Sequence, residues 1–575
     1  MCLSLCFQQY NLNTMLNTKF YFSIIILLSF SSEAIFCQSS NTDSTVSVSD
    51  FGAISNDIYN DRDEINKALI HCKENKIAKL FFPPGKYILS HPDAIKLMED
   101  VMDLKMGVDP EKIIFTPYFP YIKGLDISNQ SNLELIGQGV ELIFKGWMEP
   151  ISIENSKNII VNGFTIDYER QPHSEGRVIN IGSKFFDVAF NDDYQVKSSM
   201  VMPRIMFWDN TKNRLHKDPI YFPEKNELIE PQVLRIWSKI PQSYANSTAL
   251  INHSFHFRPA ILLHESSDII LENVTIHSQP GMGILGHRSH NILMKGLRVV
   301  PRAGKKMSTN TDATHFTSCT GFIRFKNCTF EAQGDDATNV HNYYYTITGQ
   351  VKDKYITRVD APTGTHAQVL DYPTVGDTLE LVDKYTLKVK KQLFVTSVDT
   401  FPMKWETHLS FDKKLPANFQ DYLLINVSRL PSLHMEGCTI LSHLARGVLI
   451  KTRNVIIENS TILETTGTAI HIGAEGGWHE GPGSANVIIR NNRILRCGRG
   501  AGTQNGASGI AVNVKSEKPS KSGVHKNLLF ENNIIEGENA KYGIYVTGAE
   551  NVTIRYNQIT GCEIPVYINK TDEKK

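Results

Sequence analysis

The chain has 575 residues, and its 60 Lys plus Arg balance its 60 Asp plus Glu, so the formal net charge is zero. A balanced charge without a long basic run gives no support for a nucleic-acid partner or for binding to an acidic membrane surface. The hydrophobic content of 41% excludes a disordered chain, and the length allows several domains or one large repetitive domain with insertions.

The N-terminus has the layout of a secretory signal peptide, which we place at residues 1–37. Lys19 precedes an apolar run at residues 20–30, and a small, polar stretch follows. This run is shorter than the roughly 20 residues that span a bilayer, so we expect a secreted protein without a membrane span. Lipidation of Cys37 is the alternative, and the bulky Phe36 before it speaks against that modification.

The mature chain opens with "VSDFGAISNDIYNDRDEINKALIHCKENKIAKLFFPPGKYIL", which is typical of a strand, a loop, a short helix and a further strand. The predicted helix has Ile65, Leu69 and Ile70 on one face and an acidic first turn. Such a helix caps the end of a solenoid, where an open sheet edge would otherwise be exposed.

A repeat runs along the rest of the chain. Each unit has alternating apolar residues, a corner of Asn or Gly, and another apolar position, and neighbouring units start 22 to 24 residues apart. A short strand followed by a tight corner cannot bury its own apolar face, whereas stacked coils share a core. The fold class is therefore all-β, a right-handed parallel β-helix. Examples are "KNIIVNGFTI" (157–166), "SDIILENVTI" (267–276), "HNILMKGLRV" (290–299), "RNVIIENSTI" (453–462) and "ENVTIRYNQI" (550–559).

Two stretches lack the repeat. Residues 168–256 and 342–430 show alternating strands with turn signals, and unstructured loops of such length are improbable. We interpret both as inserted small β-barrel or β-sandwich modules. The cap and first coils then occupy residues 46–167, the central coils 257–341, and the C-terminal coils 431–575.

Three carboxylates flank one strand of the central coils. Asp312 lies about one coil before the adjacent Asp335 and Asp336. Successive coils are about 4.8 Å apart, so side chains that lean apart would separate the carboxylates by about 5 to 9 Å, a range that suits the acid and base of a glycosidase. Gly334 allows a turn at which both adjacent acids reach one surface. Clustered carboxylates raise at least one pKa, as a general acid requires. Solvated turn residues and cation ligands are the alternatives.

Other candidates surround these acids. His315 and His341 are either substrate contacts or buried wall histidines. Trp478, in a Gly-rich loop, could stack on a sugar, and Glu475 could accept hydrogen bonds from sugar hydroxyls. Arg170 and Arg302 could hydrogen-bond sugar hydroxyls or simply pair with acids, and Gln333 and Asn339 are further candidates near the acids.

The motifs resemble glycoside hydrolase family 110, the exo-acting α-1,3-galactosidases. The resemblance extends from Phe51 to the final repeats and includes "IDYERQ", "VVPRAGKK", "TDATHF", "AQGDDATNVH" and "GAEGGWHEGP". It implies hydrolysis of a terminal α-1,3-linked galactose with inversion and without a metal or other cofactor. It also implies that Asp312, Asp335 and Asp336 are the catalytic carboxylates. By similarity to inverting β-helical hydrolases, we expect Asp335 to be the general acid and Asp312 and Asp336 to hold and deprotonate the water, although the sequence alone does not fix this division of roles.

Three other functions fit the same fold. An endo-acting polygalacturonase-like hydrolase would need an open cleft and basic residues for uronate carboxylates. A calcium-dependent polysaccharide lyase would use the three Asp to hold the cation, with a Lys or Arg as the base. A glycan-binding adhesin would need no catalytic acid. For a glycosidase the partner is a galactose-containing oligosaccharide or glycan, and flat faces of the helix or barrels could support a homodimer.

Overall fold

The computed structural model describes residues 44–116, 119–359, 371–520 and 523–569. The predicted signal peptide and Cys37 lie outside these residues. No helix among the described residues has the length and apolar character needed to cross a bilayer. The N-terminal part contains β1 (Thr45–Ser47), η1 (Val48–Phe51), α1 (Arg62–Asn75), β2 (Lys79–Phe81), β3 (Gly85–Ser90), α2 (Pro92–Met102) and α3 (Glu111–Ile114).

Helix α1 lies where the cap was predicted, but its buried face differs in one residue. Ile65 and Leu69 are buried as expected, together with Ala68 and Cys72. Ile70 was predicted on the same face and is 56% exposed. The reason is helical geometry: Ile70 follows Leu69 by about 100°, which turns its side chain away from the first coil.

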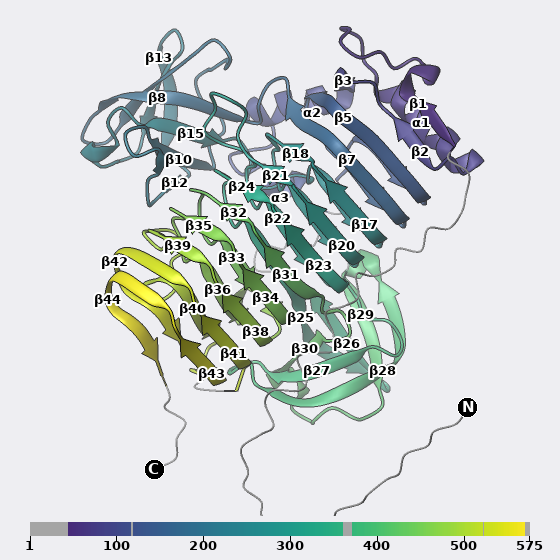
Figure 1. The fold of residues 1–575 in the computed structure, drawn as a ribbon, viewed down its shortest axis with the longest axis vertical. Helices are drawn as coiled ribbons and strands as arrows, with labels where there is room; N and C mark the ends of the chain where they lie inside the picture. The colour runs from purple at the N-terminus through teal and green to yellow at the C-terminus, as the bar shows by residue number, and fades with distance from the viewer. Residues whose placement is uncertain (1–43, 117–118, 360–370, 521–522, 570–575) are drawn as a thin grey trace, which may run out of the picture. The chain divides into compact units, whose positions relative to one another are not determined.

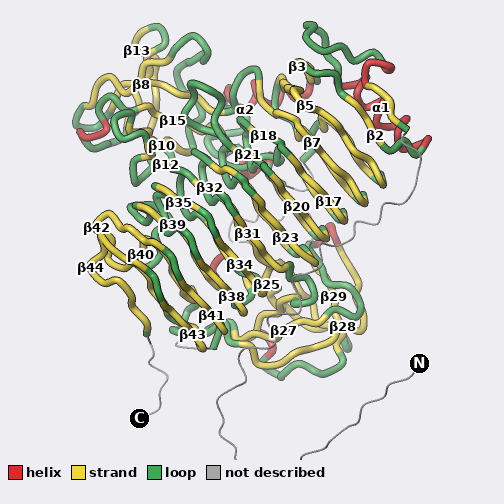
Figure 2. The backbone as a smooth tube through the Cα atoms, viewed as in Figure 1, coloured by secondary structure: helices red, strands yellow, loops and turns green. Residues whose placement is uncertain are grey.

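The remaining chain is dominated by three ladders of parallel strands, stacked coil upon coil (Figures 1 and 2). Together with the family match reported below, they confirm the predicted parallel β-helix. The first ladder continues from β1 and β2 through β5 (Ser131–Lys145), β7 (Lys157–Tyr168), β17 (Ser267–Glu272), β20 (His290–Lys295), β23 (Thr320–Lys326), β31 (Ser432–Glu436), β34 (Arg453–Glu458), β38 (Ala485–Arg490), β41 (His525–Glu531) and β43 (Ala549–Arg555).

The second ladder begins with β3, shares β5 and β7, and meets the first at the corner that the repeat encodes. Its further strands are β18 (Thr275–Ile276), β21 (Arg298–Val299), β24 (Thr329–Phe330), β32 (Thr439–Ile440), β35 (Thr461–Leu463), β39 (Arg493–Leu495), β42 (Ile534–Val546) and β44 (Gln558–Ile568).

The third ladder carries the predicted acids at its strand entrances. It ends on β42 and β44, and the short β37 (Glu480–Gly481) pairs antiparallel with two of its strands. Its other strands are β4 (Lys123–Ser128), β6 (Glu149–Glu154), β16 (Ile261–His264), β19 (Ile284–His287), β22 (Thr314–Thr317), β25 (Thr338–Val351), β33 (Val448–Ile450), β36 (Ile470–Glu475) and β40 (Ala507–Lys515).

Asparagine ladders fix the corners between coils. On the outside, Asn551 Nδ2 donates to Asn527 Oδ1 at 3.1 Å, and both residues have positive φ. Asn527 and Asn551 therefore form corners of the kind that the repeat predicts. Inside, Asn533 is fully buried; it donates to Ile489 O at 2.9 Å and accepts from Asn492 N at 3.1 Å.

The internal ladder gives a stability prediction. Asn533→Ala is expected to destabilise the fold by about 1–3 kcal/mol, because Ile489 O and Asn492 N would be left buried without partners. Asn527→Gly is the matched control, since it removes exposed hydrogen bonds but tolerates the positive φ. Thermal unfolding of both variants tests the prediction, and equal shifts would contradict it.

The first inserted module is an antiparallel sheet over its own apolar core. Arg214 ties it to the C-terminal coils by ion pairs with Glu464 at 2.5 Å and Glu538 at 2.7 Å. The module contains β8 (His173–Ile181), β9 (Phe186–Phe190), β10 (Arg204–Asp209), β11 (Arg214–Leu215), β12 (Ile220–Tyr221), β13 (Lys225–Glu230), β14 (Val233–Trp237), η2 (Gln242–Tyr244) and β15 (Thr248–Asn252).

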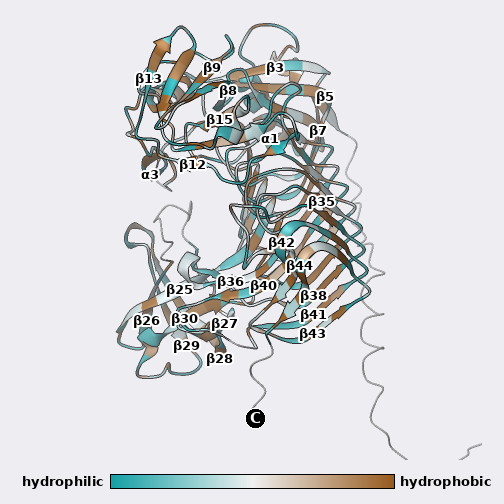
Figure 3. Cartoon of the chain, turned by 90° about the vertical axis from the view of Figure 1, so that its left-hand side faces the viewer, coloured by the Kyte–Doolittle hydropathy of each residue, from teal (hydrophilic) through white to brown (hydrophobic). Residues whose placement is uncertain are grey.

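The second module is a closed barrel, in the antiparallel order β25, β26, β29, β28, β27, β30 and back to β25. Strand β25 begins in the β-helix and continues into the barrel. The module is therefore attached directly to the coil that carries Asp335 and Asp336. Both modules project from the same side of the coils (Figure 3). The new elements are β26 (Lys354–Val359), β27 (Thr378–Asp383), β28 (Val389–Phe401), η3 (Pro402–Lys404), β29 (Glu406–Phe411), η4 (Phe419–Asp421) and β30 (Tyr422–Asn426).

Candidate functional site

Three consecutive coils place charged residues in one column at the entrance to the third ladder. The register aligns Thr314 of β22 with Thr338 of β25, and Thr338 with Val448 of β33. The residues two positions earlier are Asp312, Asp336 and Arg446, so they stack on one another. The repeat thus brings the acids together as the sequence predicts, and it adds an arginine that the sequence argument missed.

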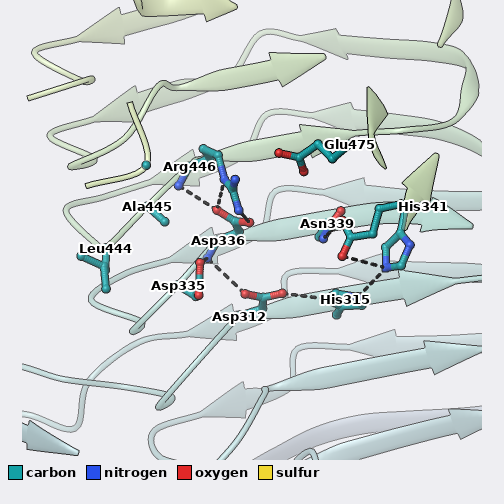
Figure 4. Close-up of polar contacts among 12 residues, drawn as sticks. Asp312, His315, Asp335, Asp336, Asn339, His341, Leu444, Ala445, Arg446 and Glu475 are labelled. Carbon is teal, nitrogen blue, oxygen red and sulfur yellow. Dashed lines mark hydrogen bonds and ion pairs between the residues drawn. The ribbon is translucent and has the colours of Figure 1, made fainter. Parts of the chain in front are cut away.

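The carboxylates lie closer together than expected. One oxygen from each of Asp312, Asp335 and Asp336 falls within 4.8 Å of the others. The predicted separation of about 5 to 9 Å assumed side chains that lean apart. Instead, the amide N–H of Asp336 lies 3.2 Å from Asp312 Oδ1 and 3.1 Å from Asp335 Oδ1, and these contacts draw the side chains together (Figure 4).

Arg446 is the partner of Asp336. Its backbone N and its Nε both donate to Asp336 Oδ1 at 2.8 Å, and a terminal guanidinium nitrogen donates to Oδ2 at 2.6 Å. The Asp336 side chain is only 2% exposed. Three donors, two of them charged, thus fix the position of this buried carboxylate. Burial opposes the charge on Arg446, but Asp336 keeps the pKa of Arg446 well above its usual range.

Asp335 has the opposite environment. Burial raises its pKa to about 7, and the charges of Asp336 and Asp312 add to that effect. Gly334 is needed before it for space: a Cβ would lie 2.2 Å from Asn310 O and 2.3 Å from a guanidinium nitrogen of Arg204. The glycine therefore serves close packing on the neighbouring coil. Asp335 is the carboxyl group of the three that is best suited to carry a proton near neutral pH.

A short row of hydrogen bonds leads away from Asp312. Asp312 Oδ2 lies 2.7 Å from His315 Nδ1, and His315 Nε2 lies 2.8 Å from His341 Nε2. His341 Nδ1 is 3.2 Å from the Asn342 carbonyl oxygen, which only accepts, so this nitrogen carries a proton. Burial lowers the pKa of His341 to about 3, which keeps the ring neutral.

The proton on His341 Nδ1 determines the tautomers of His341 and His315. Because neutral His341 accepts at Nε2, His315 donates from its own Nε2. One further proton is then shared between His315 Nδ1 and Asp312 Oδ2. Burial raises the pKa of Asp312, and His315 acts in the opposite direction. With that proton on the His315 side of the contact, Asp312 is a carboxylate and can itself take a proton from a water molecule.

A second charged group lies farther along the coils. Lys451 is fully buried and pairs with Glu475 at 2.8 Å and with Glu480. Asn339 Nδ2 donates to Glu480 Oε2 at 3.3 Å, while its buried Oδ1 has no partner. Burial alone would raise the pKa of Glu475, but Lys451 and Arg446 hold it well below its usual range. Glu475 and Asn339 are therefore near the acids, as predicted, within an ion-paired network.

The other predicted residues have the following surroundings. Arg170 donates to the His173 carbonyl oxygen at 2.7 Å and to Ser174 Oγ at 2.8 Å, and burial lowers its pKa to about 10. Arg302 pairs with Asp167 at 3.2 Å. Gln333 is buried, and neither of its side-chain amide atoms has a hydrogen-bond partner. Trp478 ends η5 (Gly476–Trp478), directly after Glu475, and is 44% exposed.

Arg446 and Lys451 could have been found in the sequence. Aligning "GDDATNV" with "LARGVLI" by their apolar positions places Arg446 under Asp336. The signal is hidden because the second module separates the two coils by 110 residues.

Comparison with known proteins agrees with this architecture. Residues 423–573 match the family described as a right handed beta helix region. Alpha-1,3-galactosidase A of Shewanella woodyi is 27% identical over 486 residues, covering 79% of this chain and 77% of its own. Alpha-1,3-galactosidase B of Parabacteroides distasonis is 26% identical, covering 74% and 72%. Alpha-1,3-galactosidase A of Bacteroides fragilis is 25% identical, covering 85% and 83%.

Among solved structures, the A-module of a mannuronan C-5 epimerase from Azotobacter vinelandii is 11% identical, with a TM-score of 0.43, covering 91% of this chain and 97% of its own. So low a score carries no argument about function. The named relatives, by contrast, confirm the resemblance to glycoside hydrolase family 110 that the motifs predict.

Proposed function

We propose that this chain, whose curated relatives are α-1,3-galactosidases and whose motifs resemble those of glycoside hydrolase family 110, is an exo-acting, inverting glycosidase that releases terminal non-reducing α-1,3-linked galactose. The observation that carries the proposal is the division of the three carboxylates into one with a pKa of about 7 and one that is ion-paired to an arginine. Such a division is what acid and base roles require.

In the proposed mechanism Asp335 donates its proton to the glycosidic oxygen as the bond to C1 of galactose breaks. Asp312 and Asp336 orient a water molecule on the opposite face, and Asp312 takes its proton while His315 keeps the proton that it already carries. Attack from that face converts the α-linked sugar into β-galactose. The hydrogen bonds from Arg446 hold the Asp336 carboxylate in place, so that Asp336 can position the water.

The charges around the acids support this assignment over a polygalacturonase-like hydrolase. Arg446 and Lys451, two buried cations beside the predicted site, are both paired with carboxylates, and the buried Arg204 donates to Asn252 Oδ1 and to the carbonyl oxygen of Asn310. A uronate carboxylate would have to displace one of those partners at a cost of several kcal/mol. A neutral galactose needs no such exchange, and it can use Asn339, Glu475 and the ring of Trp478.

The same charges disfavour a calcium-dependent lyase. The three acids are close enough to share a cation, but Asp336 already accepts three hydrogen bonds from Arg446. The raised pKa of Arg446 also makes it a poor base. We therefore expect dialysis against a chelator to leave the hydrolysis of an α-galactoside unchanged. Loss of activity that calcium restores would favour the lyase.

Proton NMR of the products from α-1,3-galactobiose tests the main proposal. The β anomer of galactose is expected first, with the α anomer appearing only by mutarotation. Release of the α anomer would contradict inversion, and no release would contradict the galactosidase itself. A longer α-1,3-galactan should yield only galactose, because an exo-acting enzyme takes one terminal residue at a time.

We further propose that the chain is exported and acts on a glycan outside the cytoplasm, because its N-terminal apolar run has the layout of a signal peptide. The balanced charge speaks against a nucleic-acid partner. A homodimer through the faces of the helix or barrels is tested by sedimentation.

A further inference from the structure

A group of aromatic side chains from the first module lies beside the predicted acids. Tyr221 and Phe222 follow one another at the end of β12, and both pack against Phe255. The ring centroids are 6.1 Å apart for Tyr221 and Phe255, and 5.8 Å apart for Phe222 and Phe255. The guanidinium of Arg204 lies over the Phe255 ring at 5.3 Å. We call Tyr221, Phe222 and Phe255 the aromatic platform.

The platform is more exposed than packing alone explains. Tyr221 is 52% exposed and Phe222 is 47% exposed. Phe222 also has a φ of 46°, a conformation that is uncommon for a bulky residue and costs about 1–3 kcal/mol. Because about half of the Phe222 ring stays in water, its burial contributes little stability to offset the cost of the positive φ. The conformation is better explained by a ligand that covers the ring.

Arg204 connects the platform to Asp335. Tyr221 lies opposite Arg204 in the pairing of β12 with β10. Arg204 donates to the carbonyl oxygen of Asn310 and packs against Gly334, the residue before Asp335. Partial burial raises the pKa of Tyr221, and the charged groups that act on it are Arg204 and Asp335. The platform therefore stands on the Asp335 side of the acids.

The position of the general acid defines the side of the leaving group. In the proposed function Asp335 protonates the glycosidic oxygen, so the sugar that keeps this oxygen departs on the Asp335 side. Glu475, Glu480 and Trp478 belong to a different loop, farther along the coils. One face of a galactose ring carries several C–H groups, and exposed aromatic rings suit such a surface.

We propose that Tyr221 and Phe222 bind the leaving-group sugar, a neutral hexopyranose linked through its 3-hydroxyl, by stacking on its C–H face. This inference rests on the proposed function, since it takes its direction from the role of Asp335. It predicts that the first module determines which glycans are accepted, while the coils and the Trp478 loop bind the terminal galactose.

Two substrates that differ only in the leaving group test the inference. α-1,3-Galactobiose presents a sugar to the platform, whereas α-galactosyl fluoride presents a single atom. Tyr221→Ala and Phe222→Gly are expected to raise KM for galactobiose about 10- to 50-fold and to leave kcat/KM for the fluoride within about twofold. Glycine relieves the positive φ at residue 222. Tyr556→Gly is the control, because Tyr556 is 75% exposed with a φ of 56° on a C-terminal coil.

Each other outcome has a distinct meaning. Unchanged KM for galactobiose in both variants would overturn the inference, and so would an equal loss on the two substrates, which would indicate a structural role. A change of oligomeric state in gel filtration would replace it with a subunit interface. If the unmodified enzyme hydrolysed neither substrate, the proposed function would fail, and the platform proposal with it.

Discussion

Asp335→Asn is expected to lower kcat for α-1,3-galactobiose about 100- to 10,000-fold, the range that general acid catalysis contributes. The same variant should keep most of its activity on α-galactosyl fluoride, because fluoride leaves without a proton. Measured side by side, the two substrates separate loss of the proton donor from loss of the fold.

The pH dependence gives an independent measure of the same group. Asp335 must be protonated to act, and its pKa is about 7, so activity on galactobiose should fall as the pH rises through about 7. With α-galactosyl fluoride, whose leaving group needs no proton, the wild-type enzyme should lack this limb. A wild-type profile that stays flat from pH 6 to 9 would contradict the assignment.

Asp335→Asn should increase the stability of the fold although it lowers the activity. A carboxyl group whose pKa is raised in the folded state binds its proton more tightly there, so its ionisation destabilises the fold above the folded pKa. Asp335→Asn removes that charge, and we expect a gain of about 1–2 kcal/mol at pH 8 that disappears at acidic pH. Asp336→Asn is the contrasting variant, since it leaves Arg446 without its partner.

The second large effect is expected at Arg446. Arg446→Met should lower the activity on both galactobiose and galactosyl fluoride about 100-fold or more, because Asp336 loses the side-chain donors that position it beside the attacking water. It should also destabilise the fold by about 3–5 kcal/mol, the usual result of leaving a buried charge unpaired. Kinetics with the two substrates and thermal unfolding provide the measurements.

Two further variants sharpen this test. Arg446→Lys keeps the charge but not the planar fork, so it should recover stability more than activity. The double variant Asp336→Asn/Arg446→Met should regain most of the lost stability and remain inactive, because no buried charge is then unpaired. Wild-type activity of Arg446→Met on the fluoride would remove Arg446 from the mechanism.

The fold was predictable because its signal is repeated. Corner residues such as Asn527 and Asn551 recur with the coil period, and an error at one coil does not disturb the others. At the cap, by contrast, the predicted buried face was wrong at Ile70. A single helix has no repeated units against which that prediction could be checked. Within the barrel, the closing pair of β25 with β30 joins segments too distant for a local pattern to reveal.

The candidate site was predictable in part for the same reason. Asp312, Asp335 and Asp336 are one period apart, so the stacking rule brings them together. Arg446 is their neighbour by the same rule, but the inserted barrel interrupts the period. For Arg302 the residue type alone leaves both a sugar contact and an ion pair open, and the structure shows the ion pair, with Asp167 at 3.2 Å.

The barrel that separates Asp336 from Arg446 also has a consequence for the order in which the protein is made. At about 5–20 residues per second, the 110 residues between them take roughly 5 to 20 s to emerge. During that interval the coil that carries Asp336 has emerged without the arginine that pairs with it. The candidate site is therefore completed only after the coil that follows the barrel has been made. A longer barrel would delay this step without altering the finished geometry.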